Sequence, residues 1–594
     1  MKKILALLLA LVMVLGMAAC GGDTASEASA PVESAASSEA APAPEAEEPA
    51  PEAAPEEAAP AEEGSAAAEA EEVPAEDDGL ITTDYVYELP LLDEEFSFSM
   101  WVSFSDNMSE FMPNQFNDNK GYQLAEEITG VHVELVNVST EANSEQFNLR
   151  VASGDLPNVV TNVAMLWTSS WDSAIEDEVF IDLEEIIEYM PAYSECYEQL
   201  PDATKRDLHT DSGYMPKLIS INNYPTGATE GAFIRTDYLE AVGMEMPTTY
   251  EELDAVLRAF QSELGLPEPW MATSGIVHTS NALCSGYGVN GGFSVFPMVS
   301  EPYFMVDGEV KFGIVEEGFK EYMQMFATYY ADGIISPDFM SKNTNPMEFA
   351  GTIASGDVGV FFGETNMVPD YYNQGKATDE NFEIAPLAPI TKTEGETTHF
   401  GTAKSPISGR LAGISVSTAD TDLEKLATYL DFFFTEEGAL ISAMGVEGNE
   451  DGSYVWDENG ELQYSDNWNN LEGIGENNKP TLYIYSVMPM LCPKTPSSYS
   501  MDVQFECEEV WDSNTDSDYR MPDAITMTAD ESSDYSTIYS DIQTLISEEL
   551  SKFAVGDRSM DEWDSFVDTI WEMGLQDCID IKQTAVDRYY ERAV

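Results

Sequence analysis

Residues 96–104 read Phe-Ser-Phe-Ser-Met-Trp-Val-Ser-Phe, and this stretch decides the fold class. Large apolar residues occupy every second position and alternate with serines, with Trp101 standing at one of the serine positions. A period of two is typical of a β-strand that buries one face. The stretch therefore predicts a strand whose apolar side faces a core.

The flanking sequence places this strand in an alternating series. A helical pattern at 123–129 ends at Gly130, a residue suited to closing a helix, and a second alternating run follows at 131–135. A helical stretch at 144–152 then leads to an apolar strand at 158–163. Strands that alternate with helices in this way predict an α/β fold.

Helix signals recur farther along the chain. Thr249 and Glu252 have the spacing of a capping box, in which each side chain bonds the backbone of the other residue. Apolar residues at helical spacing predict an amphipathic helix over 538–553. A Ser-Gly-Asp turn at 355–357 precedes a short apolar strand at 358–362.

The N-terminus predicts export. Lys2 and Lys3 precede an apolar run at 4–16, which is shorter than a membrane span and has the length of a signal peptide. Small residues lead directly into Cys20, and this resembles a lipobox, in which residues 1–19 are removed and the cysteine is acylated. Each buried acyl CH₂ contributes about 0.8 kcal/mol, so several chains would hold the protein at a membrane. The alternative is an ordinary signal peptide with an accidental cysteine.

Residues 20–84 predict a tether. From residue 21 onward they are almost entirely Ala, Glu, Pro, Ser and Gly, and no aromatic residue occurs before Tyr85. Such a segment cannot bury enough apolar surface to offset its loss of entropy on folding. Proline and like charges favour extension, so we expect a spacer between a lipid anchor and a folded body.

The charge is strongly negative. The chain has 110 Asp and Glu against 25 Lys and Arg, giving −85; residues 1–84 hold 19 of the acids and 2 of the bases, which leaves 91 against 23, or −68, from residue 85 onward. Nucleic acid and anionic lipid head groups would be repelled, and a polyanionic ligand is disfavoured. Neutral and cationic solutes remain, and a solvated acidic surface explains much of the charge.

Length and cysteines bound the architecture. The roughly 510 residues after the tether exceed one ordinary core and predict two or more domains. The five cysteines beyond Cys20 show no CxxC spacing and predict no disulfide framework. No second apolar segment approaches the length of a membrane span.

Taken together, these pieces resemble the family 1 extracellular solute-binding proteins of ABC importers, the carbohydrate-type group to which maltose-binding protein belongs. The tail also looks like the large Gram-positive lipoprotein branch. The phrases that carry the likeness are residues 152–160 (ASGDLPNVV), 234–243 running into 247–253, 329–339 followed by 356–360, 426–448, and the tail 583–589.

The resemblance implies an α/β, periplasmic-binding-protein-like fold of type II with two lobes, a hinge and an interlobe cleft. Lobe one would hold 85–222 and 405–446, and lobe two 223–404 and 447–594. Ligand would bind at loops after strand ends and would be buried by hinge closure.

Candidate ligand contacts follow the predicted strands. Trp167, Trp171 and Asp172 follow the strand at 158–163, where sugar-binding relatives place an aromatic ring and a carboxylate. A pyranose packs its apolar face on a flat ring and donates hydroxyl protons to a carboxylate, although either tryptophan could instead belong to the core. The other candidates are Asp106 and Asn107, for which an ordinary solvated turn at the strand end is the alternative, together with Glu230 near the presumed hinge, Asn366 and His278.

Metal and catalytic motifs are weak. Asp512, Asn514, Asp516, Asp518 and Asp523 loosely match a calcium loop, but Ser517 stands where the loop needs glycine, and such coincidences are expected among 110 acids. The four histidines form no HExxH motif, and no GxSxG or P-loop phrase occurs. The sequence therefore predicts no catalytic residues and no cofactor.

The resulting expectation is a monomeric lipoprotein on the outer face of the cell membrane that binds an oligosaccharide and passes it to ABC permease subunits. Two alternatives stay open: the same fold binding a peptide or a cationic metabolite, and an exported enzyme or adhesin. Stabilisation by a solute without turnover separates the binding proteins from the enzyme, and a glycan panel separates the ligands.

Overall fold

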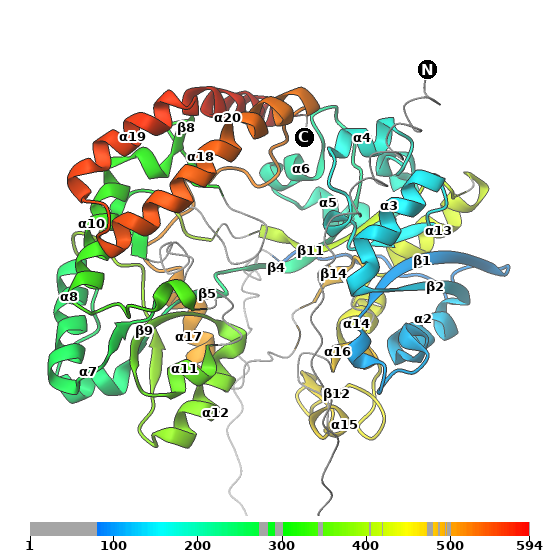
Figure 1. Ribbon diagram of the computed structural model, residues 1–594. Helices are drawn as coiled ribbons and strands as arrows, with labels where there is room; N and C mark the ends of the chain where they lie inside the picture. Colours follow the sequence, from blue (N-terminus) through cyan, green and yellow to red (C-terminus); the bar gives the residue numbers. More distant parts are fainter. Residues whose placement is uncertain are drawn as a thin grey trace, which may run out of the picture. The chain divides into compact units, whose positions relative to one another are not determined.

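The first sheet is built around the quoted stretch. The computed structural model describes residues 80–272, 283–290, 301–342, 349–402, 405–418, 420–471, 479–484, 488–493, 495 and 501–592. Within them, β1 spans Phe96–Phe104 and is an inner strand of a six-stranded sheet with the order β14-β4-β11-β3-β1-β2 (Figure 1). The other strands are β2 (Val131–Ser139), β3 (Val159–Thr161), β4 (Leu218–Thr226), β11 (Ser405–Ile414) and β14 (Leu491–Cys492).

The predicted strand is confirmed as β1, and it buries Trp101 as well as the alternating apolar residues. The Trp101 side chain is 0% exposed, and its Nε1 donates a hydrogen bond of 2.9 Å to Oδ1 of Asn143. Because β1 pairs in parallel with both β2 and β3, it lies inside the sheet, and inner strands of parallel sheets are covered on both faces.

A second sheet has the order β10-β5-β9-β6. Its strands are β5 (Glu230–Arg235), β6 (Glu268–Trp270), β9 (Val358–Glu364) and β10 (Ile384–Pro386). The predicted capping box is confirmed at α8, and the predicted amphipathic helix lies within α18. Each sheet has its own buried apolar cluster, so the chain has two α/β lobes, as the resemblance implies.

The helices surround these sheets. α2 and α3 are slightly longer than the helical patterns at 123–129 and 144–152, and Gly130 closes α2 with a φ of 73°. The helices include α2 (Lys120–Thr129), α3 (Asn143–Ser153), α4 (Trp171–Glu176), α5 (Pro191–Glu198), α6 (Asp202–Leu208), α8 (Tyr250–Ala259), α13 (Asp420–Phe432), α17 (Asp502–Trp511), α18 (Ala529–Val555) and α20 (Leu575–Tyr590).

Two strands connect the lobes. β4 ends at Thr226 in the first sheet, and β5 starts in the second sheet at Glu230. β11 pairs antiparallel with β4 and also with β3, so it carries the chain back to the first lobe. Figure 1 shows β4 and β11 between the two groups of elements.

Two boundaries differ from the sequence-based division. Ile81 is only 7% exposed and belongs to the first core, so the folded body begins before residue 85. The boundary at residue 85 relied on the first aromatic residue, whereas Ile81 is aliphatic and lies before it. Tyr454, Met490 and Leu491 also belong to the first core, although 447–594 was assigned to lobe two. β14 explains this return, because it pairs with β4 of the first sheet.

Among the described residues, no helix combines the length and the apolar character needed to cross a membrane. The described cysteines form no disulfide with one another.

Candidate functional site

A cavity of about 680 Å³ lies between the two lobes. The first lobe contributes α4, α6 and the adjoining strands β4 and β11, and the second contributes residues 517–526 and the end of α20. Thr161, the last residue of β3, and Leu218, the first of β4, both pair with Ala412. The wall at Lys217 is therefore level with the carboxyl end of β3, the edge where open α/β sheets bind ligands.

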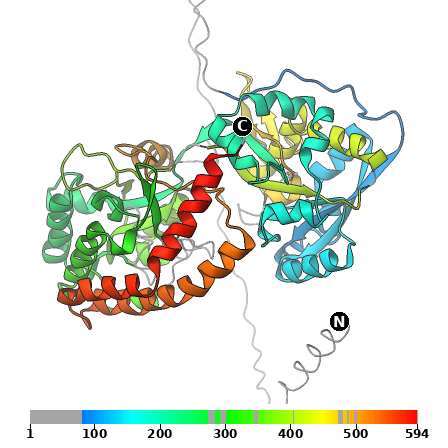
Figure 2. The same ribbon diagram turned by 90° about the horizontal axis from the view of Figure 1, so that it is seen from above.

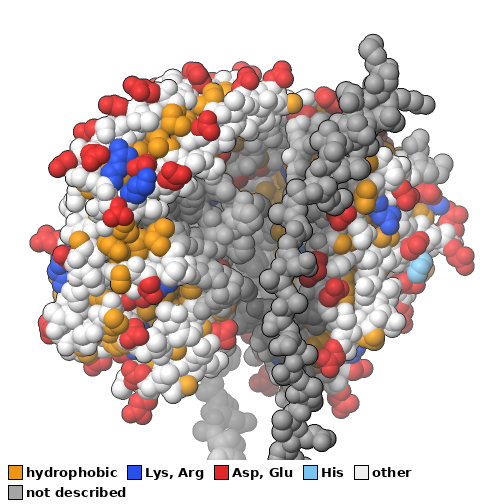
Figure 3. Space-filling model, in the orientation of Figure 1, with side chains coloured by type: hydrophobic (Ala, Val, Ile, Leu, Met, Phe, Trp, Pro, Cys, Tyr) orange, Lys and Arg blue, Asp and Glu red, His pale blue; other side chains and the backbone are white. Residues whose placement is uncertain are grey.

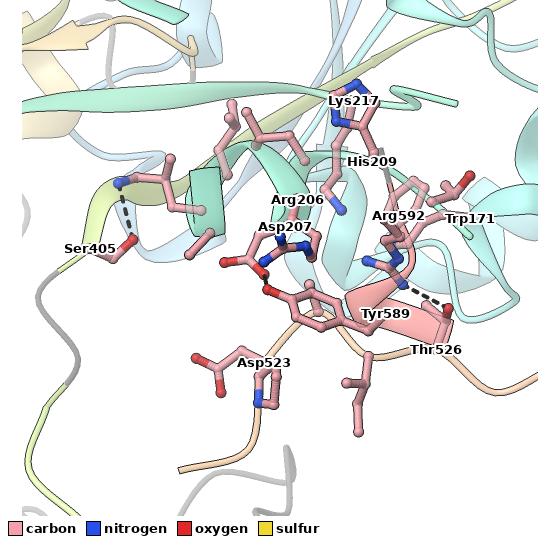
Figure 4. A pocket seen from close by; sticks show the side chains of 18 of the residues that line it. Trp171, Arg206, Asp207, His209, Lys217, Ser405, Asp523, Thr526, Tyr589 and Arg592 are labelled. Carbon is pink, nitrogen blue, oxygen red and sulfur yellow. Dashed lines mark hydrogen bonds between the residues drawn. The ribbon is translucent and has the colours of Figure 1, made fainter. Parts of the chain in front are cut away.

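Trp171 and Lys217 form one wall of this cavity (Figure 4). Nζ of Lys217 lies 4.6 Å from the centroid of the Trp171 ring, and among the described residues it forms no hydrogen bond or ion pair. Burial disfavours the charged amine, and Arg592 repels it, which lowers the pKa of Lys217 to about 8 despite the attraction of Asp207. The site thus holds a cation whose three donors are unused.

The opposite wall is aromatic. The hydroxyl of Tyr589 donates a hydrogen bond of 2.6 Å to Oδ1 of Asp207. The guanidinium carbon of Arg206 lies 5.7 Å from the ring centroids of both Tyr589 and Tyr590, and its buried Nε has no hydrogen-bond partner in the part of the chain that the structure describes. Burial raises the pKa of the Asp207 carboxyl, while the Tyr589 hydrogen bond opposes that rise.

The C-terminal residues are held in place by an ionic cluster. Nε of Arg588 and Nε of Arg592 donate to the two carboxylate oxygens of Asp211, at 2.6 and 2.7 Å. In Figure 2 the red helix α20 ends close to the first lobe. Since α20 also packs in the second core through Val586, this helix end contacts both lobes and positions Tyr589 in the cavity.

A smaller cavity of about 140 Å³ adjoins the first through Arg520, which lines both. Glu230 and Trp511 are among its other lining residues. Glu230 pairs with Glu364 across β5 and β9, so two carboxylates stand side by side. Desolvation and then Glu364 raise the pKa of Glu230, although the Glu230 side chain is itself exposed toward solvent.

Trp511 covers the backbone beneath Glu230. Its Nε1 donates to the carbonyl oxygen of Ala232 at 3.0 Å. A Cβ atom on Gly231 would stand 2.4 Å from the Trp511 ring, so only glycine allows this close approach.

The structure separates the two predicted tryptophans. Trp171 lines the large cavity, whereas Trp167 packs edge-on against Phe180, with ring centroids 6.0 Å apart. Nε1 of Trp167 donates to the carbonyl oxygen of Ser170 at 2.9 Å, which holds the start of α4. Asp172 accepts a hydrogen bond from the backbone of Ser212 and so supports the wall without lining it.

The remaining candidates are scattered. Asp106 is exposed after β1, and its carboxylate accepts a hydrogen bond of 3.4 Å from Ser139 at the end of β2. Asn366 is exposed two residues after β9, while Glu230 lines the smaller cavity. The side chain of Asn107 and all of His278 lie outside the described residues, as does Cys20.

Part of the acidic loop at 512–523 pairs with another segment. Thr398 donates to the carbonyl oxygen of Asn514 and accepts from the backbone N–H of Asp516, so the loop pairs with 398–401 like a strand. Asp516 accepts a hydrogen bond of 2.8 Å from the His399 ring, and Asp518 is the third member of the one described group that could hold a metal ion. Asp523 instead lines the large cavity.

Sequence reasoning missed Lys217, Arg206 and Tyr589. Figure 3 shows acidic side chains over the visible surface and few basic ones. Against the 110 acids and 25 bases of the chain, the large cavity is lined by four bases and two acids. That imbalance was not readable from the sequence, because the four bases come from three separate segments.

Comparisons with known proteins agree with this architecture. The family model of the bacterial extracellular solute-binding proteins matches residues 103–440. The fructooligosaccharide ABC transporter substrate-binding protein FusA of Streptococcus pneumoniae is 21% identical over 526 residues, which is 82% of this chain and 90% of FusA. The polygalacturonan/rhamnogalacturonan-binding protein YtcQ of Bacillus subtilis is 19% identical over 54% of this chain and 61% of its own length.

Among solved structures, an extracellular solute-binding protein from Bifidobacterium longum subsp. infantis superposes with a TM-score of 0.67 at 18% identity, covering 84% of this chain and 99% of that one. This likeness supports the two-lobed α/β fold.

Proposed function

Because the chain belongs to the bacterial extracellular solute-binding proteins, we propose that it captures an oligosaccharide outside the cell and delivers it to the permease subunits of an ABC importer. The observation that carries this proposal is the large interlobe cavity, which is lined by the rings of Trp171, Tyr589 and Tyr590. Aromatic rings offer a rigid apolar surface to the face of a sugar.

Polar groups around these rings suit the hydroxyls of a sugar. Asp207 and Asp523 are acceptors, and Arg520 and Lys217 are donors, all on the cavity wall. Few polar groups placed among apolar ones are what fixes the orientation of a small ligand. FusA and YtcQ are both named for carbohydrate ligands, which also favours a glycan.

The position of the cavity supports capture by closure. Ligand held by Trp171 and Tyr589 touches both lobes, since these residues come from α4 and from the end of α20. A ligand that contacts both lobes stabilises the closed arrangement, and permease subunits can then recognise the closed form.

We further propose that the protein is a monomeric lipoprotein anchored through Cys20 on the outer face of the membrane, with the acidic segment as its tether. Its role in this account is binding and delivery, without catalysis or a cofactor.

A thermal-shift screen tests the proposal. The folded body is mixed with a panel of neutral and acidic oligosaccharides, with short peptides and cationic metabolites as further arms. We expect a glycan to raise the melting temperature and to remain intact on chromatography. Stabilisation by peptides or cationic metabolites alone, or cleavage of the glycan, would contradict it.

A further inference from the structure

The large cavity is lined by more basic side chains than acidic ones. The bases that line it are Arg206, Lys217, Arg520 and Arg592, against Asp207 and Asp523. Such a surplus is unexpected in a chain of net charge −85. It marks the cavity as chemically different from the rest of the surface.

These bases are not equivalent. The guanidinium of Arg592 is paired within the protein, because it donates to Asp211 at 2.7 Å and to the Thr526 hydroxyl at 3.0 Å. Arg520 reaches Asp523 at 3.9 Å. Each therefore has an anionic partner within the protein.

Lys217 and Arg206 form no ion pair with a carboxylate of the described residues, although Asp207 attracts both at longer range. Nζ of Lys217 lies over the Trp171 ring, and Arg206 lies over the two tyrosine rings and interacts with the side chain of Tyr589, while its buried Nε has no hydrogen-bond partner among the described residues. Figure 4 shows the Lys217 amine directed into the cavity. A cation held among aromatic rings without an acceptor is a favourable place for a ligand anion, because a buried donor without a partner carries a desolvation cost.

We propose that the cavity binds a hexuronate-containing oligosaccharide, with the carboxylate accepting hydrogen bonds from Lys217 and Arg206 while the sugar face lies against an aromatic ring. This inference rests on the proposed function and names the class of glycan. The amine of Lys217 and the guanidinium of Arg206 can together bind one carboxylate, and a chain of uronates presents one carboxylate on each sugar ring.

The negative charge of the body does not exclude such a ligand. Exposed charges farther than a Debye length of about 8 Å are largely screened at physiological salt. A carboxylate in contact with Lys217 is within hydrogen-bonding range and partly out of water, so the local attraction outweighs the distant repulsion. The repulsion would slow association more than it weakens the bound state.

The experiment is a calorimetric titration with a matched pair of probes. One is trigalacturonate, and the other is the same trimer with its carboxylates reduced to primary alcohols. Each is titrated into the wild-type chain and into Lys217→Gln, Arg206→Gln and the control Lys425→Gln, which alters a surface ion pair with Glu94. Melting temperatures confirm that each variant is folded.

We expect wild type and the control to prefer trigalacturonate by about tenfold or more, as charge-assisted hydrogen bonds imply. Lys217→Gln should lose that preference, with Arg206→Gln showing a smaller loss. Affinity for the reduced trimer should change much less, because Gln keeps a hydrogen-bond donor at each position and loses only the charge. Equal binding of the two probes, unaffected by Lys217→Gln, overturns the uronate inference and leaves oligosaccharide binding intact. Absence of binding by both probes and by every glycan of the screen refutes the proposed function itself.

Discussion

Arg592 and Asp211 are 381 positions apart in the chain, yet Nε of Arg592 lies 2.7 Å from Oδ1 of Asp211. Arg588 and Thr526 also donate to Asp211, so one carboxylate of the first lobe holds the C-terminal part of the second. Although burial would raise the pKa of Asp211, these hydrogen bonds lower it overall. The relationship explains how Tyr589 reaches the cavity wall.

Replacing Asp211 with Ala should lower the free energy of unfolding by about 3–5 kcal/mol, because the buried guanidinium of Arg592 loses its counter-charge and Arg588 is left with Glu531 alone. Denaturant unfolding measures this. The control is Glu94→Ala, which breaks an exposed pair with Lys425 and should leave the midpoint unchanged. Asp211→Ala behaving like that control would show that the cluster contributes little.

Trp171→Ala and Trp167→Ala should give opposite results. Trp171 lines the cavity and also packs against the first core, so its loss should reduce glycan affinity by about tenfold or more and lower the melting temperature to some extent. Removing a core aromatic side chain costs about 3–5 kcal/mol. Trp167 packs on Phe180, so its loss should lower the free energy of unfolding by about 3 kcal/mol or less and leave affinity intact. Titration and melting of both variants decide this, and normal binding by Trp171→Ala would place the contacts elsewhere.

Affinity for an acidic oligosaccharide should fall as pH rises from about 7 to about 9. The pKa of Lys217 is lowered to about 8, so its amine is mostly charged at neutral pH and loses its proton above that value. A bound carboxylate favours the charged amine and shifts the midpoint upward. Arg592, Asp207, His209 and Trp171 surround the amine, and of the two ionisable groups that affect its pKa, only Asp207 opposes deprotonation.

Calorimetry across this pH range provides the measurement, with Lys217→Arg as the control, since guanidinium stays charged. The variant should show a flat profile. An equal decline in wild type and Lys217→Arg would attribute the effect to another group.

Removing residues 21–78 should leave stability and affinity unchanged, whereas removing residues 21–84 should lower the melting temperature. Ile81 is buried in the first core, and the backbone N–H of Thr82 donates to Gln199 at 3.2 Å. Comparing the two truncations by calorimetry locates the start of the folded body. A loss of affinity in the shorter deletion would make the acidic segment part of the site.

Replacing Cys20 with Ala should release the protein from the membrane into the medium, because the proposed anchor is the acyl chains carried by Cys20. Fractionation of cells expressing each form checks this. Retention of the variant in the membrane fraction would refute the lipobox interpretation.

Local sequence patterns predicted much of the fold. Alternation at 96–104 gave β1 its full extent, and Thr249 with Glu252 forms the capping box of α8. These signals arise from residues close together in the sequence, so they can be read without knowledge of the tertiary structure. The burial of Trp101 and the return of Tyr454, Met490 and Leu491 to the first lobe depend on strand pairing, which local patterns do not contain.

The site was less predictable. Trp171 could be proposed because it follows a strand, but nothing near it in the sequence indicates Lys217, which is 46 positions later, or Tyr589 at the end of α20. Segments far apart in sequence meet only after folding. Nothing in the sequence singles out Arg206 or Lys217, because their proposed role depends on the absence of an ion pair with a carboxylate of the described residues, which only the structure shows.

The most direct measurement of the central claim is a crystal structure of the folded body with the tightest-binding glycan of the screen. The account predicts a sugar ring in the interlobe cavity, in contact with Trp171 from the first lobe and with Tyr589 or Tyr590 from the second. A well-ordered glycan bound away from that cavity, with no contact to any of these rings, would contradict it.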